Sequence, residues 1–151
     1  MSGLVLIAYD GSDHAKAAIG EAGRQLEPGR PALVLTISEP IERLPFLGAA
    51  GVAFDADSME TLFEAATSGA EKTAAEGAEL ARAAGFEAEP LAITGGPAWD
   101  QIVATADQRD ADLIVLGSRG RSGIKYAVLG SVAAAVVQHS KRTVLVTHSS
   151  V

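Results

Sequence analysis

Four short, continuously apolar segments recur along the chain. They cover residues 4–9, 32–37, 113–116 and 143–147 and are rich in β-branched side chains. Each segment is too short for a helix, and the absence of polar alternation predicts strands buried on both faces. Residues 86–93 indicate a weaker fifth strand. Pro90, which has no N–H to donate to a neighbouring strand, places it at an edge of the sheet.

The segments between these strands have the apolar spacing of amphipathic helices. The longest helix is predicted over residues 58–84, with most of its charged residues on the opposite face and Gly85 ending it. Three shorter helices are predicted over residues 12–26, from Pro97 towards residue 109, and from Ser131 to about residue 139.

Strands that alternate with helices predict an α/β fold with a parallel sheet and helices on both faces. We expect a single, doubly wound, open five-stranded sheet in the order 3-2-1-4-5, because this order puts the Pro90 strand at one edge and the last strand at the other. At this length, one domain over residues 1–151 is expected. The irregular residues 39–57 are too long for a routine connection and are predicted to form a flap over a site.

The amino-acid composition excludes several kinds of functional site. The chain has no Cys, which excludes disulfides, thiolate nucleophiles and zinc–thiolate sites. It has no apolar run long enough for a membrane span and no basic leader ahead of its first apolar run. We therefore expect a cytoplasmic protein that does not bind a membrane.

The net charge of -7 is unevenly distributed. All 19 acidic residues lie at or before Asp112, whereas the residues after it contain five basic residues and no acid. An acidic protein is a poor partner for nucleic acid, but a small anion that meets only the last third would not be repelled. The same distribution is also expected if the acids lie on exposed helices and the last third is mostly buried.

In a sheet of this order, ligands bind at the carboxyl ends of strands one and four. The loop that follows residue 116 carries three basic residues, no acid and several glycines. It leads to Gly130, Ser131 and Val132 at a predicted helix start, where backbone N–H groups and the helix dipole favour an anion. Turn glycines and an ordinary serine cap are the alternative reading. P-loop and dinucleotide-binding sequences are absent.

The spacing Gly117-x2-Gly120-x9-Gly130-Ser131, together with Asp10-Gly11-Ser12 and Gly95-Gly96-Pro97, resembles the nucleotide-binding signature of the universal stress protein family. The resemblance extends over nearly the whole chain. It implies a site for an adenine nucleotide in which Asp10 lies near the adenosine and the backbone of Ile37 contacts adenine. It also implies that Gly117, Gly120, Gly130 and Ser131 contact the ribose and phosphates.

We add three residues to this predicted site. Arg119 is added for its charge, Val132 because it belongs to the helix start, and Ser12 in a supporting role. Asp10 has an alternative interpretation as the cap of the first helix, because Asp is a favoured cap.

The candidate site lacks the residues of an enzyme. Its loop contains no carboxylate, His or Cys, and Asp10 is the nearby acid that could orient a water molecule. The three histidines show no metal-ligand spacing, so no protein-built metal site is expected. A phospho-acceptor receiver domain is excluded, because no Asp ends the third strand and no Lys ends the last.

We therefore expect an ATP-binding regulatory protein with at most slow hydrolysis, with any Mg²⁺ held through the phosphates. The resemblance implies a role in the stress response. The alternative is a nucleotide-independent, dimeric interaction module of the same fold. In either case the uncharged edge strand over residues 143–147 predicts a homodimer.

Overall fold

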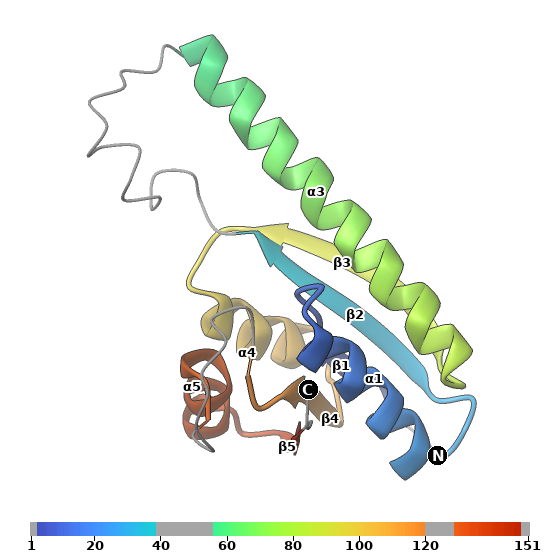
Figure 1. Ribbon diagram of the computed structural model, residues 1–151. Helices are drawn as coiled ribbons and strands as arrows, with labels where there is room; N and C mark the ends of the chain where they lie inside the picture. Colours follow the sequence, from blue (N-terminus) through green and yellow to red (C-terminus); the bar gives the residue numbers. More distant parts are fainter. Residues whose placement is uncertain (1–2, 39–55, 120–128, 149–151) are drawn as a thin grey trace.

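The computed structural model describes residues 3–38, 56–119 and 129–148 (Figure 1). Strands and helices alternate along the described chain in this order: β1 (Val5–Ala8), α1 (Asp13–Gln25), β2 (Pro31–Ser38), α3 (Ala56–Ala83), β3 (Glu87–Thr94), α4 (Ala98–Gln108), β4 (Leu113–Gly117), α5 (Ser131–His139) and β5 (Thr143–Thr147).

The strands form one parallel sheet in the order β3-β2-β1-β4-β5, which confirms the predicted fold class. Val5 of β1 is in register with Ala32 of β2 on one side and with Leu113 of β4 on the other. The β2–β3 pair is the longest and runs to Ser38 and Thr94. The carboxyl ends of all strands therefore meet at one edge of the sheet.

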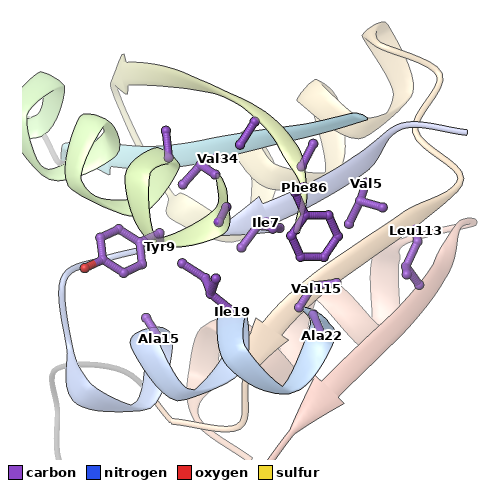
Figure 2. Close-up of a cluster of buried hydrophobic side chains, with 14 residues drawn as sticks. Val5, Ile7, Tyr9, Ala15, Ile19, Ala22, Val34, Phe86, Leu113 and Val115 are labelled. Atoms are coloured by element: carbon purple, nitrogen blue, oxygen red, sulfur yellow. The ribbon is translucent and has the colours of Figure 1, made fainter. Parts of the chain in front are cut away.

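Each face of the sheet is covered by two helices. Side chains along a strand point alternately to the two faces, so an apolar cluster forms under the helices on each face. On one face, Val5 and Ile7 pack with residues of α1 and α3, as Figure 2 shows. On the other face, Leu6 packs with residues of α4 and α5, including Ile102 and Val136. This arrangement confirms the doubly wound prediction and explains why β1 is buried on both faces.

Helix boundaries follow local capping chemistry. The Ser12 hydroxyl accepts a hydrogen bond from Ala15 N–H at 3.1 Å and starts α1. Past the end of α3, Gly85 adopts φ 107°, a conformation that glycine accepts without strain.

Most predicted boundaries differ from the observed ones by a residue or two, including the starts of two helices. Helix α4 begins at Ala98, because Pro97 is its extended N-cap rather than its first helical residue. Helix α3 begins at Ala56, two residues before the predicted start and inside the stretch expected to be irregular. The flap predicted in that stretch falls on residues 39–55, which lie outside the described residues.

Candidate functional site

A cavity of about 360 Å³ lies at the carboxyl edge of the sheet, at the ends of the neighbouring strands β1 and β4. This is the position at which doubly wound sheets bind ligands. Its described lining comes from β1, β2 and β4 together with the first turns of three helices: Ala8, Tyr9, Asp10, Ala15, Leu35, Ile37, Ala98, Ile102, Leu116, Gly117, Ser118, Arg119, Gly130, Ser131, Val132 and Ala133.

The acidic side of the cavity is formed by Asp10, which lies two residues beyond the end of β1. Its Oδ1 accepts a hydrogen bond from Ser12 N–H at 2.9 Å, which fixes the carboxylate across a tight turn at Gly11. Ser12, not Asp10, is the cap of α1. The interpretation of Asp10 as the helix cap is therefore wrong, and Asp10 is one of the residues that line the cavity.

The opposite side of the cavity is the start of α5. Gly130 N–H donates to Ser118 O at 2.7 Å, and Ser118 N–H donates to Thr147 O at 2.8 Å, so the start of α5 is tied to the ends of β4 and β5. The first intrahelical bond runs from Ala134 N–H to Gly130 O at 2.9 Å. The N–H groups of Ser131, Val132 and Ala133 precede this bond at the positive end of the helix dipole.

This arrangement can hold an anion. Helix N-termini bind phosphate because their N–H groups point outwards and the dipole favours negative charge. The dipole alone contributes about 0.3–2 kcal/mol, so a phosphate chain would need several of these amides together. Gly130 is buried and lines the cavity directly ahead of them.

The remaining wall is apolar. Leu35 and Ile37 of β2, Leu116 of β4, and Ala98 and Ile102 of α4 line it. A flat, weakly polar ring such as a nucleobase is the kind of group that such a wall accommodates. The cavity therefore offers an apolar slot, one carboxylate and an anion-favouring helix start within one space.

Most of the predicted site residues meet in this cavity. Asp10, Ile37, Gly117, Arg119, Gly130, Ser131 and Val132 line it. Ser12 does not line it, and its hydroxyl caps α1. Gly120 lies outside the described residues.

The structure also reveals contributions that the sequence reading missed. Ala98 and Ile102 bring α4 into the lining, and small apolar residues carry no chemical signal in a sequence. A Cβ at Gly117 would lie 3.2 Å from His14 O, so this glycine also allows β4 to pack closely against the first turn of α1. Trp99 is a packing residue: it lies against the core and its ring stacks on His139 with centroids 4.4 Å apart.

Two further features are absent from the part of the chain that the structure describes. No group of three or more His, Asp or Glu side chains is placed to hold a metal ion. None of the described helices is both long and apolar enough to cross a membrane.

Tyr9 connects the cavity wall to α3. Its buried hydroxyl donates a short hydrogen bond to Glu76, whose Oε1 also lies 3.7 Å from Lys16 Nζ. Its backbone is held by β2, because Thr36 Oγ1 donates to Tyr9 O at 2.8 Å. Burial, and then the hydrogen bond to Glu76, raise the pKa of Tyr9 above its ordinary value.

We expect Tyr9→Phe to lower the free energy of unfolding and to make that free energy depend less on pH in the alkaline range. At neutral pH the lost hydrogen bond should lower the free energy of unfolding by about 1–2 kcal/mol. An unfolded tyrosine has a pKa of about 10, so the contribution of Tyr9 is complete below that pH and is lost as pH rises towards its higher folded-state pKa. Urea unfolding between pH 7 and 11 tests this, and equally steep alkaline loss in both proteins would contradict it.

The chain is similar to known proteins over nearly its whole length. The model of the Universal stress protein family matches residues 1–148. A universal stress protein of Thermus aquaticus is 35% identical over 153 residues, covering 93% of this chain and 95% of the relative.

Solved structures give the same result. The structure of the protein MJ0577 superimposes with a TM-score of 0.80 at 21% identity, covering 100% of this chain and 99% of the other, which supports the fold alone. A universal stress protein solved in complex with cAMP has a TM-score of 0.58 at 28% identity, with 97% of each chain covered.

Proposed function

The chain belongs to the universal stress protein family, and on that premise we propose that it is a cytoplasmic, adenine-nucleotide-binding regulator of the stress response. Its nucleotide is ATP, with any Mg²⁺ held through the phosphates. Bound nucleotide changes the conformation of the protein or its choice of partner.

The observation that carries this proposal is the composition of one cavity. Asp10, the apolar wall at Ile37 and the first N–H groups of α5 all line the same space of about 360 Å³. Adenine would occupy the apolar wall, Asp10 would accept hydrogen bonds from the adenosine hydroxyls, and the phosphates would lie at Ser131 and Val132. The cAMP complex of a relative supports the adenine-nucleotide class.

Binding rather than turnover is the proposed activity. Asp10 and Arg119 are the charged side chains of the described lining, and no His lines it there. Oδ1 of Asp10 accepts the Ser12 N–H, and its remaining acceptor capacity is assigned to the adenosine hydroxyls rather than to an attacking water molecule. Hydrolysis of bound ATP should therefore be slow at most.

Calorimetric titration of the full chain with ATP tests the proposal, with cAMP and GTP in parallel. We expect heat of binding and a raised Tm with ATP, and markedly weaker effects with GTP, whose base carries different hydrogen-bonding groups. No heat and no Tm shift with either adenine nucleotide would replace the proposal with the nucleotide-independent interaction module.

We further propose a homodimer formed through β5. This strand is the sheet edge beyond β4, and its start is anchored because Arg142 Nε and Nη1 bind Asp107 at 3.1 Å and Asp110 at 2.9 Å. An edge with no charge and no Pro is a template for pairing with a second copy.

Light scattering at micromolar concentration tests the dimer. Leu145 packs against the core, so Leu145→Lys would disturb folding as well as the edge. Thr143→Lys is the cleaner change, because Thr143 is exposed at the start of β5. We expect it to raise the dimer dissociation constant about tenfold or more, since lysine blunts sheet edges. Gln25→Lys, at the exposed end of α1, is the matched control, and a monomeric wild type would contradict the proposal.

A further inference from the structure

The first part of α3 extends past the end of the sheet, as Figure 1 shows. Thr67 Oγ1 lies 3.1 Å from Thr94 Oγ1, and Thr94 is the last residue of β3. Residues 56–66 therefore lie beyond the level at which β3 ends, and at 1.5 Å per residue they span about 16 Å. We call this segment the α3 overhang.

The overhang carries an apolar stripe. Met59, Leu62, Phe63 and Ala66 have the i, i+3, i+4, i+7 spacing of one helix face. Further along α3, the same face is continued by the buried residues Ala70, Ala74, Ala78 and Ala81, which pack on the sheet.

In the overhang this stripe is only partly buried, because Met59, Leu62 and Ala66 are half-buried and Phe63 is exposed. Phe63 is 50% exposed, whereas Ala81, five turns further along the same face, is 0% exposed. None of the described residues of α3 before Ala70 is buried. An exposed phenylalanine in a continuous apolar row is typical of a surface that binds another molecule.

The charge next to the stripe indicates what kind of molecule binds. Asp57, Glu60 and Glu64 follow the spacing i, i+3, i+7, so they form a second row beside the apolar one. The first cation along α3 is Lys72, beyond the overhang. Two copies of this surface would bring six carboxylates together, which disfavours self-pairing and favours a basic partner.

We propose that the α3 overhang is a docking surface for a basic amphipathic helix of another protein. The partner helix lays apolar residues at i, i+3, i+4 and i+7 against Met59, Leu62 and Phe63. Its Lys or Arg residues lie opposite Asp57, Glu60 and Glu64. The surface is separate from the nucleotide cavity, whose described lining includes no residue of α3.

A labelled synthetic helix tests the proposal by fluorescence anisotropy with the full chain at physiological salt. The probe has leucine at i, i+3, i+4 and i+7 and lysine on its flanks. A second probe keeps the leucines and has glutamate on its flanks. We expect wild type to bind the lysine probe and not the glutamate probe.

Matched variants locate the binding surface. Phe63→Ser should weaken binding about tenfold or more, because it removes the exposed aromatic ring of the stripe. Leu80→Ser is the control, since Leu80 is a 36% exposed apolar residue elsewhere on α3. Glu60→Lys with Glu64→Lys should exchange the preference between the two probes, whereas Glu89→Lys, on β3, should not. Leu62→Ser replaces Phe63→Ser if circular dichroism shows that the latter is unfolded.

Three results would overturn the proposal. One is absence of binding, or binding that Phe63→Ser and Leu80→Ser weaken equally. Another is self-association of wild type that Phe63→Ser dissolves, which would assign the stripe to a second copy of the chain. The third is a Tm lowered by Phe63→Ser in a protein that does not bind the probe, which would assign the stripe to a contact within the chain.

Discussion

Gly130→Glu is expected to abolish nucleotide binding, with the dissociation constant for ATP rising about 100-fold or more. Gly130 is buried, lines the cavity and is the N-cap directly ahead of Ser131 and Val132. A glutamate there would place a carboxylate at the helix start where the phosphates are proposed to bind. The carboxylate would occupy the anion position itself and repel the ligand.

Two further variants show whether the effect of Gly130→Glu comes from the new charge, from the added side-chain volume or from the change in net charge of the whole protein. Gly130 has φ -61° and ψ 161°, which any residue adopts, so Gly130→Ala adds only a methyl group without backbone strain and should weaken binding less. Gly20→Glu adds the same charge to exposed α1, where a new Cβ meets nothing within 4 Å, and should bind ATP as wild type does. Wild-type affinity in Gly130→Glu would place the phosphates away from α5.

The fold was predictable because its three central strands, β1, β2 and β4, are buried on both faces. An unbroken apolar run such as residues 113–116 has few alternatives to a central parallel strand. The order of the strands then followed from Pro90, which restricts its strand to an edge, and from the right-handed crossovers of parallel sheets. Boundaries were less certain, as Pro97 shows, because an N-cap and a first helical position are adjacent and both accept the φ of about -65° that proline adopts.

The site was predictable where its residues carry a chemical signal. Asp10 and the Gly130–Ser131 helix start have distinctive chemistry, and they line one cavity. The sequence could not decide which of Asp10 and Ser12 caps α1, because both are favoured caps and only their geometry separates the roles. The contribution of α4 was missed because Ala98 and Ile102 are chemically silent and reach the cavity through packing alone.

Gly77 is the second position where a small change should have a large effect, this time on stability. It lies on α3 over the end of β1, and a Cβ there would be 2.6 Å from Cδ2 of Tyr9 and 2.7 Å from Cγ1 of Val34. Both neighbours are buried, and the Tyr9 ring is fixed at its far end by the hydrogen bond to Glu76. Neither side chain can therefore move aside without a cost in free energy.

Gly77→Ala therefore has two opposite effects on the free energy of unfolding. Replacing glycine by alanine inside a helix stabilises by about 0.5–1 kcal/mol, while forcing an extra methyl into a packed core costs about 1–3 kcal/mol. With three contacts below 3 Å, we expect the packing cost to exceed the helical benefit and the free energy of unfolding to fall by about 1–2 kcal/mol. Gly69→Ala on the same helix is the matched control, because its Cβ meets nothing within 4 Å. That variant should gain the full helical benefit of about 0.5–1 kcal/mol.

The two alanine variants differ only in what the new methyl group meets, since the helix and the change in the unfolded chain are the same. Their unfolding free energies in urea at pH 7 should therefore differ by about 2 kcal/mol, which corresponds to Tm values separated by about 4–8 °C for a chain of this size. Equal stabilities would mean that α3 moves away from the sheet at little cost. In that case the contact between Tyr9 and Glu76 would not be holding the helix against the wall of the cavity.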